Sequence, residues 1–158
     1  MGAEVRQEKT NVAIRTLLPS DAAAVTKILQ MAPEAANWSG KSFEELLDWS
    51  GSVVLASETS GELSGFLFGR RIGDEAEILN LAIVPLGRRQ GEGGALLSAA
   101  LEEFRRRGVS RVFLEVRESN AAAIAFYLKY GFAKSGRRPG YYRDPAEAAL
   151  VMEKKLTG

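Results

Sequence analysis

A glycine-rich turn between an apolar stretch and an amphipathic one limits the folds that are open to this chain. The segment RRQGEGG (88–94) follows ILNLAIV (78–84) and precedes ALLSAALEEFRRRG (95–108). Apolar residues of the second flank recur at helical spacing, namely Leu96, Leu97, Ala100, Leu101 and Phe104. The order predicts a strand that leads through a tight glycine turn into a long amphipathic helix.

A turn of this kind can hold an anion. The first backbone N–H groups of a helix have no partner within it, and they carry about half a positive charge from the helix dipole. A phosphate suits that position, and glycines at 91, 93 and 94 would let the backbone approach it closely. Arg88 and Arg89 add positive charge. The alternative is a flexible connection whose arginines face solvent, because a glycine pattern alone is weak evidence.

The rest of the chain predicts a single domain. Apolar and alternating runs predict strands at 12–17, at 52–71 as a pair joined by ETSGE, and at 75–85, 109–116, 132–138 and 149–156. Further helices are predicted after Ser20-Asp21, after a capping box of Ser42 and Glu45, and over 118–131. We therefore expect a polar tail at 1–11 and one α+β domain at 12–158, with helices packed on a mixed sheet.

Two absences narrow the chemistry. The chain has no cysteine, which excludes disulfides and thiolate nucleophiles, and no histidine, which removes the usual neutral-pH base and the commonest metal ligand. We expect no metal, and proton transfer by Glu, Asp, Tyr or Lys. A net charge of +1 argues against nucleic-acid binding. We also expect no membrane association and a cytoplasmic location, since no apolar run is long enough to span a bilayer and MGAEVRQEKT lacks a signal-peptide core.

The motifs resemble those of a known superfamily. RRQGEGG fits the R/Q-x-x-G-x-G/A coenzyme A signature of the GNAT acetyltransferases, and LNLAIVP and GVSRVFLEVRESNAAAIAFYLKYGF flank it in the order that superfamily shows. Within it, LEVRESNAAAIAFYLKYGF, RRPGYY and NWSGKSF resemble the RimI-type ribosomal-protein-alanine N-acetyltransferases. The similarity is strong from Leu79 to Met152. It implies a mostly antiparallel sheet with helices on both faces, an α/β/α sandwich.

The resemblance implies how acetyl-CoA binds as co-substrate. Its pantetheine arm would enter a gap between the strand ending near Val84 and the strand that carries Glu115. The implied coenzyme-binding residues are Leu81, Ala82, Ile83, Arg88, Arg89, Gln90, Gly91, Glu92, Gly93, Gly94 and Asn120.

Two residues are candidates for proton transfer. Glu115 faces away from Leu114 and Val116 on its strand and matches the family's general base; the alternative is a surface carboxylate paired with a neighbouring arginine. Tyr127 follows Asn120 by two helical turns and matches the tyrosine that protonates the departing thiolate. Its alternative is a core aromatic. Without cysteine we expect direct attack in a ternary complex.

The acceptor is predicted from the same resemblance. Tyr141 and Tyr142, placed in a loop at 139–147, and Trp38 and Phe43 would line a channel for a protein N-terminus, in the first place the alanine of a small-subunit ribosomal protein. Alternatives are acetylation of a small amine (a polyamine, aminoglycoside or amino acid) and a non-catalytic acyl-CoA-binding module. We expect a monomer or weak dimer. One departure from the family bears on the acceptor, since its Glu-Asp-Ala reads Glu147-Ala148-Ala149 here.

Overall fold

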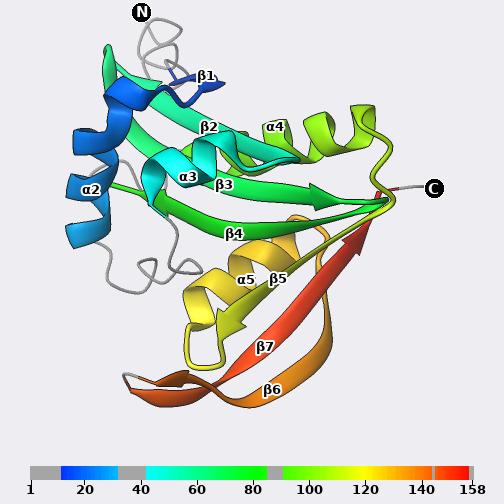
Figure 1. Ribbon diagram of the computed structural model, residues 1–158. Coiled ribbons are helices and arrows are strands. Elements are labelled where there is room, and N and C mark those ends of the chain that lie inside the picture. The colour runs from blue at the N-terminus through cyan, green and yellow to red at the C-terminus, as the bar shows by residue number, and fades with distance from the viewer. Residues whose placement is uncertain (1–11, 32–41, 85–90, 144, 157–158) are drawn as a thin grey trace, which may run out of the picture.

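The computed structural model describes residues 12–31, 42–84, 91–143 and 145–156 (Figure 1). Its strands are β1 (Val12–Thr16), β2 (Ser52–Thr59), β3 (Glu62–Ile72), β4 (Glu75–Ile83), β5 (Arg111–Arg117), β6 (Ala133–Arg143) and β7 (Ala146–Lys155). Its helices are the 3-10 turn η1 (Pro19–Asp21) and α2 (Ala22–Met31), α3 (Phe43–Asp48), α4 (Glu92–Arg106) and α5 (Ala121–Lys129).

The strands form one seven-stranded sheet in the order β1-β2-β3-β4-β5-β7-β6. Every neighbouring pair is antiparallel except β4 and β5, which are parallel. A parallel pair needs a crossover, and α4 supplies it. The predicted mixed, mostly antiparallel sheet is confirmed.

Helices cover both faces of the sheet, each over its own apolar core. One core joins α4 and α5 to the sheet through side chains such as Leu97, Phe104 and Tyr127. The other joins α2 and α3 to the opposite face through Ile28 and Leu46. The α/β/α layering therefore follows from two separate apolar faces.

The parallel strands β4 and β5 part soon after they meet. Their register runs only from Glu75 opposite Arg111 to Ile78 opposite Leu114. Near the same point a bulge in β4 leaves Leu79 without a partner on β3, because Phe68 pairs with Asn80 and Gly69 with Ile78. Beyond it the strands run apart, as Figure 1 shows, and the gap that the resemblance implied lies between them.

Local signals mostly act as predicted. The capping box closes, since Ser42 Oγ accepts a hydrogen bond from the Glu45 N–H (3.1 Å) and Glu45 Oε1 accepts one from the Ser42 N–H (2.9 Å). Asp21 differs from the prediction, because its carboxylate accepts the Leu18 N–H (2.7 Å) and pairs with Arg15 (2.8 Å). Asp21 thus ties β1 to the turn before α2 instead of simply starting a helix.

The final hairpin is longer than predicted. Tyr141 and Tyr142 lie within β6 and not in a loop, and Tyr142 pairs in register with Glu147. The register shifts between Arg138 and Tyr142, around Pro139 and Gly140. Pro and Gly predicted a turn there, but pairing with β7 resumes beyond the irregularity and carries the strand onward. No helix in the described ranges is long and apolar enough to cross a membrane.

Candidate active site

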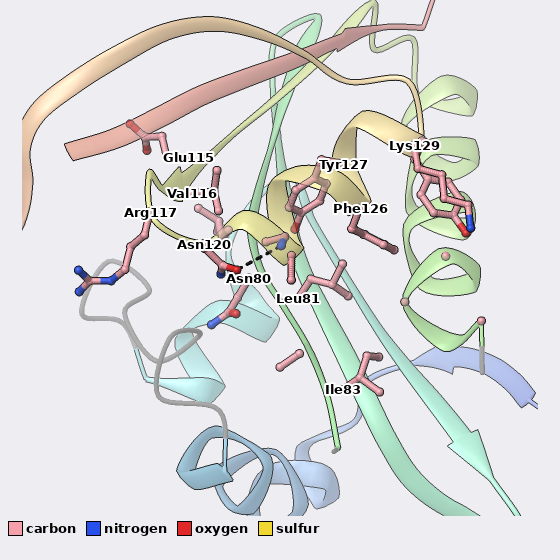
Figure 2. Close-up of a pocket in the computed structure, with 18 of the residues that line it drawn as sticks. Asn80, Leu81, Ile83, Glu115, Val116, Arg117, Asn120, Phe126, Tyr127 and Lys129 are labelled. Carbon is pink, nitrogen blue, oxygen red and sulfur yellow. Dashed lines mark hydrogen bonds between the residues drawn. The ribbon is translucent and has the colours of Figure 1, made fainter. Parts of the chain in front are cut away.

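A cavity of about 660 Å³ opens where β4 and β5 separate (Figure 2). Its walls are the diverging strands, the side of α5 and the N-terminus of α4. Most of the predicted site residues that the structure describes line it, namely Leu81, Ala82, Ile83, Gly91, Gly93, Gly94, Glu115, Asn120, Tyr127 and Tyr142. Trp38, Arg88, Arg89 and Gln90 lie outside the described residues.

The N-terminus of α4 presents free backbone amides to this cavity. The first hydrogen bond along the helix joins the Ala95 N–H to the Gly91 carbonyl (3.0 Å), so the amides of residues 92, 93 and 94 have no acceptor within the helix. Gly91 has φ of 84°, a left-handed conformation that glycine adopts without strain. This end of the cavity suits an anionic group.

The side chain of Glu92 turns away from the cavity. It is 1% exposed, and its Oε1 accepts a hydrogen bond from Thr59 Oγ1 (3.0 Å) on β2. Oε2 is buried and accepts no hydrogen bond from the described residues. Of the two polar parts of this residue, only the backbone N–H is therefore placed to meet a ligand.

Asn120 has a structural role that accounts for part of its side chain. Its Oδ1 accepts a hydrogen bond from the Ala123 N–H (3.1 Å) and caps α5. Figure 2 marks this bond beside the cavity. The Nδ2 group remains as the part of Asn120 that can donate to a ligand.

Glu115 lies on β5 at the opposite end of the cavity from α4, and two side chains of β6 hold it. The Tyr141 hydroxyl donates a hydrogen bond to Oε1 (3.0 Å), and Arg138 Nε lies 2.8 Å from Oε2. The contact with Arg138 is an ion pair without a hydrogen bond, because Oε2 accepts no hydrogen bond from the residues that the structure describes. With a side chain 11% exposed, Glu115 is a shielded carboxylate and not a solvated surface group.

A second carboxylate, Glu77, accompanies Glu115. Glu77 on β4 pairs in register with Phe113, which lies two residues before Glu115, so both carboxylates occur on one face of the sheet. Burial, and then the charge of Glu115, raises the pKa of Glu77, while Arg138 and Arg70 oppose this rise. This face of the sheet therefore carries an acidic pair balanced by arginines, and Glu115 is the member of the pair that lines the cavity.

Two tyrosines that line the cavity have raised pKa values. Burial, and to a smaller extent Tyr142, raises the pKa of Tyr127, whose side chain is 9% exposed. Burial is also the main cause that raises the pKa of Tyr142 to about 12. Both phenols therefore keep their protons at neutral pH and can act as donors.

Arg117 holds Tyr142 at the cavity. Its guanidinium lies 4.3 Å from the centre of the Tyr142 ring, 3.3 Å from Glu147 Oε1, and donates to the Pro145 carbonyl (3.0 Å). Ala148, which stands where the expected Glu-Asp-Ala has its aspartate, and the matching Ala149 are both buried in β7. Glu147 thus keeps a structural partner.

Phe43 does not reach the cavity. It begins α3, and its ring packs edge-on against Phe68 (centroids 6.1 Å apart) beside the second core. Its predicted part in an acceptor wall stays a prediction.

Comparisons with known proteins decide the family. The model of the acetyltransferase (GNAT) family matches residues 22–132. The chain belongs to the GNAT acetyltransferase family. A [ribosomal protein bS18]-alanine N-acetyltransferase of Escherichia coli K12 is 38% identical to this GNAT chain over 143 residues, covering 88% of the chain and 94% of that enzyme. One from Salmonella typhimurium is 36% identical over 146 residues, covering 88% and 94%.

Solved structures agree with this GNAT assignment. The ribosomal-protein-S18-alanine N-acetyltransferase from Escherichia coli superposes with a TM-score of 0.83 at 35% identity, covering 93% of this chain and 95% of that one. Ard1 from Thermoplasma volcanium gives 0.79 at 29% identity, covering 94% and 99%. The expected fold, the RimI-type resemblance and the enzyme class, an N-acetyltransferase, are confirmed.

Sequence reasoning missed several residues of this GNAT site. Glu77, Arg117 and Arg138 bear charges around Glu115. Phe126 and Tyr130 line the cavity and also pack against the first core. A signal existed only for Glu77, a polar residue at an alternating position of EAEIL. No cluster of acidic side chains in the described ranges could hold a metal ion.

Proposed function

We propose that this enzyme transfers an acetyl group from acetyl-CoA to the α-amino group of a protein N-terminus, and that its acceptor is the N-terminal alanine of a small-subunit ribosomal protein. The observation that carries this proposal is one cavity with free helix amides at one end and Glu115 at the other, beside the buried phenol of Tyr127. The names of the relatives point to the same acceptor.

The residues present fit acetyl-CoA. The amides of residues 92–94 suit its diphosphate. The gap between β4 and β5 is open along the part of β4 that does not pair with β5, where the extended arm can lie. Leu81, Ile83 and Phe126 give this stretch an apolar wall. Acetyl-CoA supplies a thioester, whose carbonyl carbon an amine attacks directly.

Glu115 and Tyr127 divide the proton transfers of that reaction. Glu115 removes a proton from the ammonium group, directly or through water, so that a neutral nitrogen attacks the carbonyl carbon. The attack leaves the nitrogen cationic, and it releases its second proton through water as the tetrahedral intermediate collapses. When the C–S bond breaks, Tyr127 gives its phenolic proton to the sulfur and regains a proton from water. Tyr141 and Arg138 position the Glu115 carboxylate through the contacts described above.

The choice of an α-amino group follows from basicity. A free α-amino group titrates near 8 and a lysine near 10.4, a difference of about 3–4 kcal/mol in the cost of deprotonation. A carboxylate is a modest base, and it is better matched to the α-amino group. Tyr142 also supports a protein acceptor, because it lines the cavity and an aromatic wall suits a peptide.

One observation favours a second candidate, a small cationic amine. Glu77 and Glu115 form an acidic pair, which would attract such an acceptor. The two candidates are separated by incubating the enzyme and acetyl-CoA with alanine-initiated peptides, with ribosomal proteins and with polyamines, followed by intact-mass analysis. One acetylation adds about 42 Da. This increase on the peptide, with none on the polyamine, supports the first candidate. The reverse pattern contradicts it.

The assignment of Glu115 as the base can be tested separately. Glu115→Gln keeps the size of the side chain and its hydrogen bond from Tyr141 but removes the basic site. We expect kcat to fall by about 10²–10⁴-fold, while acetyl-CoA affinity changes by no more than about threefold. Steady-state kinetics and calorimetric titration measure the two effects. An equal loss of coenzyme binding would refute the assignment.

A further inference from the structure

Tyr130, which directly follows α5, is held in a fixed place at the phosphate end of the cavity. Its ring lies against that of Phe126 (centroids 4.9 Å apart), and its carbonyl accepts a hydrogen bond from Lys154 Nζ (3.0 Å). Contacts on both the ring and the backbone leave the side chain little freedom. It lines the cavity together with Phe126.

The hydroxyl of Tyr130 meets the first turn of α4. A Cβ built on Gly94 would overlap this hydroxyl, and it would lie 2.6 Å from the ring carbon that bears it. By contrast, a Cβ on Gly93 would meet the Phe126 ring at 3.4 Å, an ordinary contact, and one on Gly91 would meet nothing within 4 Å. At position 94 a side chain is excluded because it would collide with Tyr130. At position 91 there is space for one, but the left-handed backbone conformation favours glycine.

One stripe of α5 connects the two ends of the cavity. Asn120, Ala123, Tyr127 and Tyr130 are spaced by three, four and three residues, which places them on one side of the helix, and all four line the cavity. Figure 2 shows Asn120 near Glu115 and Lys129, the neighbour of Tyr130, beside α4. Tyr127 is thus the phenol nearer the reacting end, and Tyr130 is the phenol at the anion-binding end.

We propose that Tyr130 is a coenzyme-binding residue, whose hydroxyl donates a hydrogen bond to a phosphate oxygen held by the free amides of residues 92–94. In the described part of the chain this hydroxyl makes no hydrogen bond, although it touches the residue that presents one of those amides. A hydroxyl can donate to an anionic oxygen without adding charge, and such bonds are stronger than those between neutral groups. The inference rests on the proposed use of acetyl-CoA.

The test compares acetyl-CoA with a ligand that lacks its phosphates. Acetyl-pantetheine carries the same thioester and arm as acetyl-CoA but has neither the diphosphate nor the adenosine that the diphosphate attaches. We expect Tyr130→Phe to weaken acetyl-CoA binding by about tenfold and to leave acetyl-pantetheine binding unchanged, as measured by titration calorimetry on the full chain. The ratio of the two affinities therefore falls by about tenfold.

Controls separate this role from packing. Tyr141→Phe removes a phenol at the other end of the cavity and should leave both affinities as they are in the wild type. Gly94→Ala should push the Tyr130 ring aside and reduce the same ratio, and a thermal melt shows whether each variant is folded.

Each outcome has one meaning. An unchanged ratio in Tyr130→Phe, or equal losses for both ligands, would overturn the proposed contact. Failure of the wild type to bind acetyl-CoA would instead overturn the proposed function. The two failures are thus distinguishable in one set of titrations.

Discussion

Tyr127 shows how burial suits a residue to donating a proton. Burial raises the pKa of its phenol, and the same apolar surroundings would raise the pKa of a thiolate formed beside it, so proton transfer between the two stays feasible. We expect Tyr127→Phe to lower kcat by about 10²-fold or more with little change in melting temperature or coenzyme affinity. Steady-state kinetics and thermal melts check this. A wild-type kcat would remove Tyr127 as the acid.

Glu77 should make the stability of the folded protein depend on pH. Its pKa is raised in the folded state, so the folded chain binds this proton more tightly than the unfolded chain does. The stability that Glu77 contributes is therefore full at low pH and is lost as the pH rises from about 4.3 through the folded pKa. We expect Glu77→Gln to raise the melting temperature by about 1–3 °C at pH 7 and to change nothing at about pH 3.

The matched control for this prediction is Glu62→Gln, which alters an exposed glutamate at the start of β3. It should leave the melting temperature unchanged at both pH values. A lower melting temperature for Glu77→Gln at neutral pH would show that Arg138 and Arg70 stabilise the carboxylate more than burial and Glu115 destabilise it.

At the scale of elements, Arg117 joins β5 to the β6–β7 hairpin. Its planar guanidinium stacks on Tyr142 and also reaches Glu147 and the Pro145 carbonyl, which lysine cannot do together. We expect Arg117→Lys to raise the KM of the acceptor by about tenfold, because the hairpin then holds Tyr142 less firmly. The KM of acetyl-CoA should change less, since the proposed phosphate site lies at the other end of the cavity.

Arg137→Lys is the control for that variant. Arg137 pairs with Glu118 on the exposed side of β6, where their side chains are 54% and 44% exposed, and such pairs contribute little. Its kinetics should match the wild type. Equal effects on both KM values in Arg117→Lys would mean that the arginine supports the fold as a whole and not the acceptor side.

In the whole molecule, β4 and β5 are joined by only four residue pairs. These pairs connect strands β1 to β4 with strands β5 to β7. A ligand in the cavity contacts both strands and binds only the folded state. Acetyl-CoA at about 100 times its Kd should add about 2.7 kcal/mol of stability. For a domain of this size that corresponds to a rise in melting temperature of about 5–10 °C.

This rise should persist in Glu115→Gln, because Glu115 is the proposed base and not one of the proposed coenzyme-binding residues. Differential scanning fluorimetry at several ligand concentrations measures it. A melting temperature independent of acetyl-CoA would contradict the assignment of the cavity.

Much of the fold was predictable from local patterns. Alternation located most strands, helical spacing located α4, and the capping box at Ser42 placed the start of α3. These signals work because periodicity and capping involve residues close in sequence. The motif resemblance located Glu115, Asn120 and Tyr127, and the structure brings all three to one cavity.

Local sequence patterns are enough to identify most strands and helices, the glycines that begin α4, and the proton-transfer groups open to a chain without histidine or cysteine. Only the tertiary structure decided that β7 lies between β5 and β6, that Glu77 faces the same side as Glu115, and that the Tyr130 hydroxyl touches Gly94. These contacts join residues that are far apart in the chain. They depend on strand order and register, which are set by the burial of whole faces and leave no trace in a local pattern.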